Sequence, residues 1–360
     1  GEGEGEGEGE GEGEGEGEGE GEGEGEGEGE TFTAYEPFSE GHMANQVLRV
    51  ANYSEIGTLR KTAKIADGNV DEVYGKILEL YQAVSLQDKV IGRKDMHDYT
   101  TKPDVDGAVG AWLDTQISGA MDFAKAGAEQ YHVDWAGQVV DKGLQAFFVH
   151  SVYYEINKNA QKNLDEAYGY YGLPLSGDTS EAQGVAKTAD KREGKYGEVY
   201  GVELNSTVSG LFSALKGNMA SANLADAETK LTAEDHPQVY NVHVIHRDLV
   251  DNVIYQTYLL SVIKEMDDVI NEVDNFDVKV VEGRVFWEAI RAMAHHLDAD
   301  TATKIDAGLY PGGFPARDAA DYFFVGMEDV RDGTTIIDGE TVKADVEILL
   351  NATITDDSAE

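Results

Sequence analysis

The chain has 360 residues and a formal net charge of −42 at pH 7, of which a Gly-Glu repeat over residues 1–30 supplies −15 and the other 330 residues −27. Such a charge repels phosphate backbones and anionic lipid head groups, which argues against nucleic-acid binding and favours cations or basic surfaces as partners. The absence of Cys excludes disulfide scaffolds, thiolate metal sites and Cys nucleophiles, and no apolar run is long enough to predict a membrane span.

The Gly-Glu repeat alternates with period 2. As a β-strand it would place every Glu on one face, with like charges opposed across any pairing, so we expect residues 1–30 to be disordered. From residue 31 onward, apolar residues recur mostly at helical spacing. The clearest stripe runs along one face of residues 70–84, after the Asp67-Gly68-Asn69 turn. Further helices are predicted over residues 108–127, 139–157, 163–171, 206–222, 239–273 and 283–297.

Two segments interrupt the helical pattern. Residues 176–198 are rich in Gly, Lys and Asp and show no apolar periodicity, which predicts a linker between two helical halves. Near the C-terminus, residues 334–337 and 341–349 flank Asp338-Gly339, a pair typical of a β-hairpin turn. The predicted units are therefore the repeat, a first half, the linker, a second half and an irregular segment with the hairpin, at residues 1–30, 31–175, 176–198, 199–310 and 311–360.

The two halves also resemble each other. With an offset of 110 residues and no gaps, Val140-Asp141 aligns with Val250-Asp251, and Ser151-Val152 aligns with Ser261-Val262. Apolar positions match between these pairs, although any two amphipathic helices share some of this agreement. We therefore predict a mainly α fold of two helical-bundle halves, with a small C-terminal β-hairpin and a disordered N-terminal repeat.

Several catalytic classes have no motif in this chain. It lacks a His-Glu-x-x-His zinc-peptidase motif, a Gly-x-Ser-x-Gly elbow and a Walker loop. The densest group of metal-ligand side chains is His295, His296 and Asp298, which follow Glu288. Glu288 and His295 are seven residues apart and thus share a helical face, and imidazole with carboxylate suits a transition metal. Asp298 is equally suited to cap the segment that follows it.

Three other positions carry side chains that suit chemistry. His150 lies near two Tyr residues and Glu155 on a predicted helix, where it can bind a metal or shuttle protons, or else be a satisfied core histidine. Glu265 begins an acidic run that can gather calcium, or else form a solvated helix face. Paired carboxylates such as Asp165 and Glu166 suggest a hydrolase, but adjacent helical residues point about 100° apart and do not flank one bond.

Four segments are similar to a known family: Lys142-Gly143-Leu144, the Tyr153-Tyr154 pair, residues 164–174 and Lys195-Tyr196-Gly197. Together they resemble the imelysin-related helical extracytoplasmic proteins, especially a branch of bacterial surface lipoproteins. The resemblance extends over about residues 69–309, and the Asp-Glu-Ala-Tyr-Gly-Tyr-Tyr-Gly-Leu-Pro sequence inside residues 164–174 is its specific part.

The resemblance implies an all-helical fold of two bundle-like halves, an extracytoplasmic location and a role in iron or other metal acquisition. That location is the periplasm, the cell surface or the medium. The Gly-x-His-x-x-Glu signature of imelysins is missing, because no His is followed by Glu at this spacing. The metal site and the peptidase activity of the family therefore do not carry over to this chain. Its acidic composition also fits a halophilic source, or else an extracellular, calcium-rich setting.

We therefore predict a non-enzymatic, extracytoplasmic binding protein of imelysin-like architecture. Its predicted ligand is a metal ion or metal complex, with iron, zinc, copper and calcium as candidate ions. The predicted ligating residues are His150, Glu155, Glu265, Glu288, His295, His296 and Asp298. The alternative is a structural subunit of a surface assembly or filament, whose subunit contacts are made by the terminal Gly-Glu polyanion and by the hairpin, through its exposed strand edge. A hydrolase is the weaker alternative.

Overall fold

The computed structural model describes residues 33–93, 108–271, 273–316, 319 and 321–356. The Gly-Glu repeat, for which the sequence predicts disorder, lies outside these residues. The described part of the chain is helical and forms no β-sheet, which confirms the mainly α prediction. In the same residues, no helix combines the length and the apolar character that a bilayer crossing requires.

The N-terminal part of the chain forms α1 (Glu40–Leu59), α2 (Val70–Gln82), α3 (Leu86–Ile91), α4 (Ala108–Ala126), α5 (Gln130–Ile156) and α6 (Gln161–Tyr171). The predicted helices at residues 70–84, 108–127, 139–157 and 163–171 are thereby confirmed. Their apolar stripes are the buried faces: on α2, for example, Val73, Tyr74, Ile77 and Tyr81 are all buried.

The C-terminal part forms α7 (Gly184–Tyr200), α8 (Asn205–Ser221), α9 (Pro237–Ile270), α10 (Phe276–Leu297), α11 (Ala299–Leu309), α12 (Met327–Arg331) and α13 (Gly339–Asp356). The predicted helices at residues 206–222, 239–273 and 283–297 are confirmed. Short 3-10 turns at Arg60–Thr62, Ala83–Ser85 and Thr179–Glu181 complete the described secondary structure.

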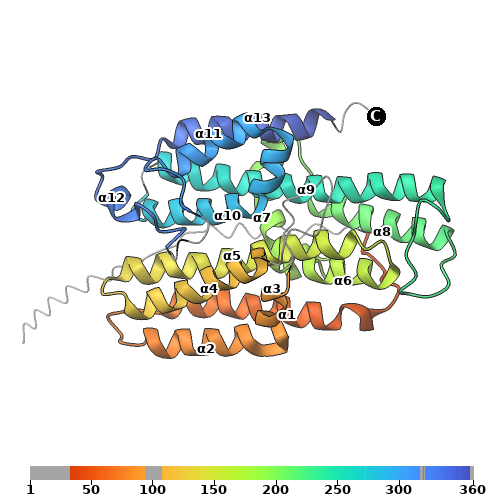
Figure 1. Cartoon of the computed structure of the whole chain (residues 1–360), viewed down its shortest axis with the longest axis horizontal. Coiled ribbons are helices and arrows are strands. Elements are labelled where there is room, and N and C mark those ends of the chain that lie inside the picture. The colour runs from red at the N-terminus through yellow and green to blue at the C-terminus, as the bar shows by residue number, and fades with distance from the viewer. Residues whose placement is uncertain (1–32, 94–107, 272, 317–318, 320, 357–360) are drawn as a thin grey trace, which may run out of the picture.

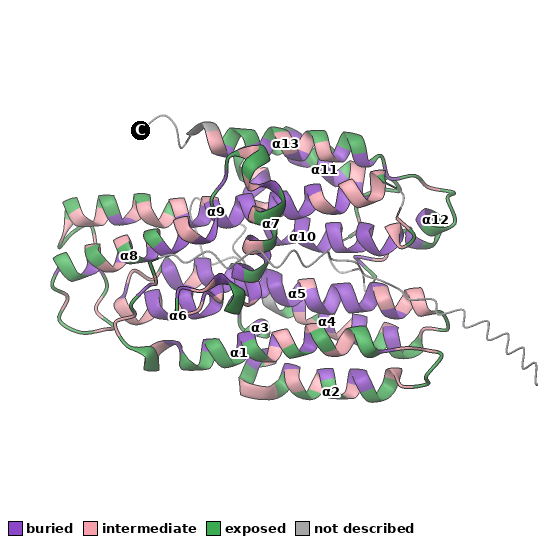
Figure 2. Cartoon of the chain, turned by 180° about the vertical axis from the view of Figure 1, so that it is seen from behind, coloured by how far each residue is buried: buried purple, intermediate pink, exposed green. Residues whose placement is uncertain are grey.

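The helices pack as layers on both sides of α5. Figure 1 shows α1, α2 and α4 on one side of α5, and α9, α10, α11 and α13 on the other. Helix α5 contacts α4, α6 and α10, while α9 contacts α8, α10 and α13. Buried residues dominate α5, α10 and the central part of α9 (Figure 2). One cluster of buried apolar side chains extends from Tyr35 to Leu350 and therefore joins both predicted halves.

The predicted C-terminal β-hairpin is wrong, because residues 339–356 form α13. Asp338 acts as a helix cap rather than a hairpin-turn residue: its carboxylate accepts hydrogen bonds from the Thr341 backbone N–H at 3.1 Å and from Thr341 Oγ1 at 2.7 Å. The following apolar residues have helical spacing, and those that are buried are Val342, Val346, Leu349 and Leu350. An Asp-Gly pair is suited to a helix N-terminus as well as to a hairpin turn, so the pair alone does not distinguish a helix from a hairpin.

The predicted irregular linker at residues 176–198 contains α7, which also differs from the expectation. Its buried face includes polar residues, so a search for apolar periodicity does not find it. Thr188 and Arg192 are both buried there, and Arg192 Nε donates a hydrogen bond to Ser261 Oγ of α9 at 3.1 Å. The helix ends at Gly201, which adopts a positive φ of 69°, as glycine does readily.

Candidate functional site

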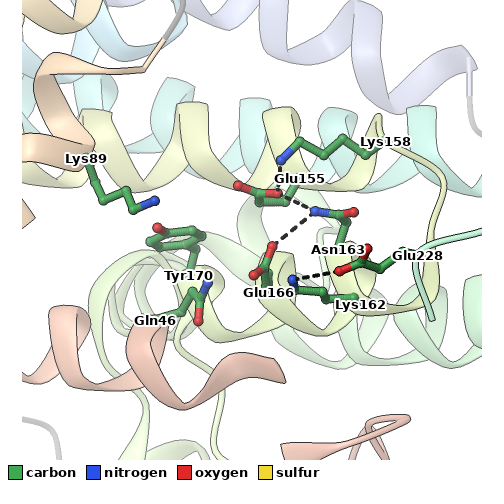
Figure 3. Close-up of a pocket in the computed structure, with 9 residues that line it drawn as sticks. All are labelled: Gln46, Lys89, Glu155, Lys158, Lys162, Asn163, Glu166, Tyr170 and Glu228. Carbon is green, nitrogen blue, oxygen red and sulfur yellow. Dashed lines mark hydrogen bonds and ion pairs between the residues drawn. The ribbon is translucent and has the colours of Figure 1, made fainter. Parts of the chain in front are cut away.

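A polar cavity of about 340 Å³ opens beside the C-terminal end of α5, along one face of α6 (Figure 3). Helices α1 and α3 and the segment before α9 complete its wall. The lining consists of three carboxylates, three ammonium groups and three neutral polar side chains. These are Glu155, Glu166 and Glu228; Lys89, Lys158 and Lys162; and Gln46, Asn163 and Tyr170.

The floor of the pocket is set by the turn between α5 and α6. Glu155 lies in the last turn of α5 and is buried. After the turn, Asn163, Glu166 and Tyr170 follow at spacings of three and four residues, which places them on one face of α6. The two helices thus bring Glu155 and Glu166 to the same polar cluster, and Asn163 lies between them (Figure 3).

Glu155 is neutralised by its neighbours. Its carboxylate accepts hydrogen bonds from Arg93 Nη1 at 3.2 Å, from Lys158 Nζ at 2.7 Å and from Asn163 Nδ2 at 2.7 Å. Burial raises the pKa of Glu155, but the Arg93 and Lys158 charges and the hydrogen bonds outweigh burial and hold this pKa below its usual range. Glu155 is therefore ionised at neutral pH, and both of its carboxylate oxygens already accept hydrogen bonds from the protein.

Glu166 has a different environment. Its Oε2 atom accepts a hydrogen bond from the same Asn163 amide nitrogen at 3.0 Å, and its Oε1 atom accepts none from a described residue. Burial and then the adjacent Glu155 carboxylate raise the pKa of Glu166. A positive charge placed beside Glu166 would relieve this repulsion, so Glu166 is the point of the pocket that is suited to a cation.

The opposite wall is fixed by an unusual turn. Val84 and Ser85 precede α3 with φ angles of 53° and 54°, in the left-handed region that β-branched residues such as Val rarely adopt. Arg49 secures this turn: its Nε donates to the Val84 carbonyl oxygen at 3.0 Å, and its Nη1 donates to the Tyr170 hydroxyl at 3.1 Å. The turn and the pocket wall on α6 are thus tied together through one Arg side chain.

Of the residues predicted to bind a metal, only Glu155 lines this pocket. His150 lies on the same helix and is buried. Glu265 is fully buried within a group of Lys and Arg side chains, 3.1 Å from Lys264 Nζ and 3.9 Å from both Lys279 Nζ and Arg192 Nη2. Glu265, which the sequence predicts as part of a calcium-binding acidic run, is therefore surrounded by largely buried Lys and Arg side chains.

The group near residue 295 also has protein partners. Glu288 Oε2 accepts a hydrogen bond from Tyr322 at 3.0 Å, and His295 Nε2 lies 2.8 Å from Asp306 Oδ2. Asp298 caps α11 by accepting from the Thr301 N–H at 3.0 Å, as its alternative interpretation proposed. His296 is exposed at the end of α10. In the described part of the chain, no three His, Asp or Glu side chains are arranged to hold a metal ion. A metal-binding role for these residues stays a prediction.

Asp165 and Glu166, the weaker hydrolase pair, serve two separate faces of α6. Asp165 is buried and accepts hydrogen bonds from the Tyr35 hydroxyl at 2.6 Å, from the backbone N–H groups of Phe38 and Ser39 at 3.0 Å each, and contacts His42 Nδ1 at 2.8 Å. This carboxylate therefore holds the start of α1, while its neighbour faces the pocket. The geometry agrees with the roughly 100° between adjacent residues on a helix.

The sequence missed Lys89, Lys158, Asn163 and the pocket role of Glu166. A usable signal was present for some of them. Asn163, Glu166 and Tyr170 form a polar stripe on α6, shortly after Glu155 in the last turn of α5 and Lys158 in the turn that follows it. Lys89 carried no signal, because its helix is separated from α6 by a long stretch of sequence.

Comparisons of the chain with protein-family models, with curated proteins and with solved structures found no match. The similarity of residues 164–174 to imelysin-related proteins therefore stays an expectation from those residues. The polar pocket is the feature of the molecule from which a function can be inferred.

Proposed function

We propose that this protein is a non-enzymatic, imelysin-like extracytoplasmic binding protein, whose ligand places a cationic group in the polar pocket against Glu166. The observation that carries the proposal is the Glu155–Glu166 pair bridged by the Asn163 amide. The net charge of −27 outside the repeat adds a long-range attraction for cations. The extracytoplasmic location rests on the sequence resemblance alone.

The surroundings of Glu166 favour an organic ammonium group over a bare metal ion. A metal ion requires several free oxygen or nitrogen ligands, but Glu155 already accepts bonds from Arg93, Lys158 and Asn163. An ammonium group needs only hydrogen-bond acceptors and a compensating charge, which Glu166 provides. Iron, zinc, copper or calcium binding through Glu166 is the alternative outcome of the test.

The alternative of a self-assembling structural subunit depended on the terminal Gly-Glu polyanion, which lies outside the described residues, and on a β-hairpin with an exposed strand edge. Because residues 339–356 form α13, that edge does not exist. No other observation in the described residues favours assembly over ligand binding.

Calorimetric titration with butylamine, and separately with Ca²⁺, Zn²⁺, Cu²⁺ and Fe²⁺, tests the proposal. We expect saturable butylamine binding that is reduced at least about tenfold by Glu166→Gln, because a hydrogen bond to a charged group is lost. Glu72→Gln, an exposed carboxylate on α2, is the matched control and should bind as the unmodified protein does. The affinity should also decrease as the pH falls, because the raised pKa of Glu166 favours its neutral form.

Equal butylamine binding by Glu166→Gln and the unmodified protein would contradict the proposal, and so would the absence of any amine binding. Binding of a metal ion but not butylamine, with loss of that binding in Glu166→Gln, would replace the ammonium group by a metal ion in the same pocket.

A further inference from the structure

The structure assigns a second charge to this ligand: we infer that it is a small zwitterion, whose anionic group binds Lys89 while its ammonium group binds Glu166. This inference rests on the proposed function, because it concerns the same pocket. It identifies the ligand class as amino-acid-like, with a positive and a negative group on one small molecule.

Two of the three ammonium groups that line the pocket already pair with carboxylates of its wall. Lys158 is bound to Glu155, with Nζ 2.7 Å from Oε2, and Lys162 is bound to Glu228, with Nζ 3.2 Å from Oε1. These contacts give two of the three ammonium groups and two of the three carboxylates a direct partner. Among the lining residues, Lys89 and Glu166 are the two charged side chains without an ion pair to a described residue, and their charges are opposite in sign. The charges of Lys158 and Lys162 act on Glu166 at longer range and offset part of the rise in its pKa.

Lys89 is available to a ligand. It is exposed, and it forms no hydrogen bond or ion pair with a described residue, while Figure 3 shows it reaching from α3 toward Tyr170. An ammonium group at the wall of a pocket, with no partner among the described residues, is a binding group for a carboxylate or another anion. A ligand that bears only a positive charge would leave Lys89 unused and would be repelled by it.

The backbone that carries Lys89 belongs to a helix that the protein anchors. Helix α3 is short, but Leu86 and Val90 are buried and anchor it. The left-handed turn at Val84 and Ser85 sets the direction of α3, and Arg49 binds that turn and Tyr170 at once. Backbone strain of this kind persists only where surrounding contacts hold it. The contacts therefore hold the backbone that carries Lys89 in place relative to the pocket face of α6.

The chemistry of the lining restricts what joins the two charges of the ligand. The pocket is lined by charged and amide side chains together with the Tyr170 ring, and among the described residues no aliphatic side chain lines it. A volume of about 340 Å³ admits a small molecule only. The ligand is therefore a compact zwitterion with a short linker, and not a lipid or a large aromatic compound.

A series of ω-amino acids measures the separation directly. Glycine, β-alanine, 4-aminobutyrate, 5-aminovalerate and 6-aminohexanoate are titrated against the full chain, with butylamine and butyrate as probes of a single charge. We expect one member to bind at least about tenfold more tightly than butylamine, because it adds a charge-assisted bond. Lys89→Gln should reduce its affinity to the level of butylamine, and it should strengthen butylamine binding because the repulsion between Lys89 and the amine is removed.

The control is Lys76→Gln, the same substitution at an exposed Lys on α2 that is paired with Glu72. It should bind every probe as the unmodified protein does. Circular dichroism of Lys89→Gln should be unchanged, because the exposed Lys89 side chain supports no described contact. The inference is overturned if no ω-amino acid binds more tightly than butylamine, or if Lys89→Gln binds the best one equally well. In both cases, butylamine binding by the unmodified protein would still support the proposed function. If the unmodified protein binds no butylamine either, both the inference and the proposed function are contradicted.

Discussion

Two buried carboxyl groups, Glu265 on α9 and Glu282 on α10, show how neighbours decide the state of a single residue. Glu282 lies 3.1 Å from Lys142 Nζ and 3.4 Å from Lys279 Nζ, and these charges outweigh burial and hold its pKa well below the usual value. Burial and then the Glu282 carboxylate raise the pKa of Glu265 to about 7. One carboxyl is therefore ionised, and the other takes up a proton near neutral pH.

This difference predicts a pH dependence of stability. Between the ordinary Glu pKa of 4.5 and about 7, folded Glu265 binds a proton that the unfolded chain has lost, so stability decreases as the pH rises through this range. The contribution is about 3 kcal/mol at most. Glu265→Gln, which stays neutral, should remove this part of the slope in urea unfolding measured from about pH 5 to pH 8.

The quantity to compare is the slope of unfolding free energy against pH in Glu265→Gln and in the unmodified protein, because other groups titrate in the same range in both. Glu72→Gln changes an exposed carboxylate and should leave the slope of the unmodified protein intact. Parallel curves for Glu265→Gln and the unmodified protein would show that Glu265 is ionised throughout.

Residues of this kind explain why the site was only partly predictable. The sequence identified Glu155 and Glu265 as carboxylates near other functional side chains, but not that Arg93 and Lys279 face them from other parts of the chain. Whether a buried carboxylate meets a ligand, a proton or a Lys depends on the helix packed opposite, and that information is non-local. The exception is Asp298, whose capping role follows from local sequence and was foreseen as an alternative.

At the scale of the helix, the outcome depended on how apolar the buried face is. Helices α2, α5 and α9 bury long apolar stripes and were predicted, whereas α7 buries Thr188 and Arg192 and was not. For α13 the local Asp338-Gly339 signal was ambiguous, and the helical spacing of the apolar residues after it was the better guide. Local turn chemistry is thus weaker evidence than periodicity over a long segment.

The capping role of Asp338 at the start of α13, in place of the predicted hairpin turn, can be tested by substitution. Asp338→Ala removes both hydrogen bonds to Thr341 and should lower the free energy of unfolding by about 1 kcal/mol, while Asp338→Asn should cost far less because Asn also caps helices. Urea unfolding of the two variants makes the comparison. Asp332→Ala, an exposed residue beside α12, is the control and should be nearly neutral. Equal stability of the Asp338→Ala and Asp332→Ala proteins would show that this cap has no effect on stability.

For the whole molecule, several of the basic residues lie in the interior, where they pair with carboxylates. Arg60 binds Asp141 with Nη2 2.9 Å from Oδ2, and Arg93, Lys142 and Arg291 are likewise paired with carboxylates and largely shielded from solvent. Each such pair is neutral, so the charge of −27 outside the repeat belongs to the remaining, mostly exposed residues. The outer surface is therefore more acidic than the composition suggests, and its carboxylates repel one another.

Salt should therefore stabilise this protein. Raising NaCl from about 0.05 M to about 1 M shortens the distance over which charges act to roughly 3 Å, which weakens repulsion among exposed carboxylates but hardly affects the buried pairs. We expect the melting temperature to rise by several degrees in differential scanning calorimetry. A variant that begins at residue 31 loses 15 of the negative charges but keeps −27, so it should show most of the same increase. A melting temperature that stays constant or falls with salt would contradict this expectation. It would mean that exposed ion pairs, which salt also weakens, stabilise the protein at least as much as the repulsion among its excess carboxylates destabilises it.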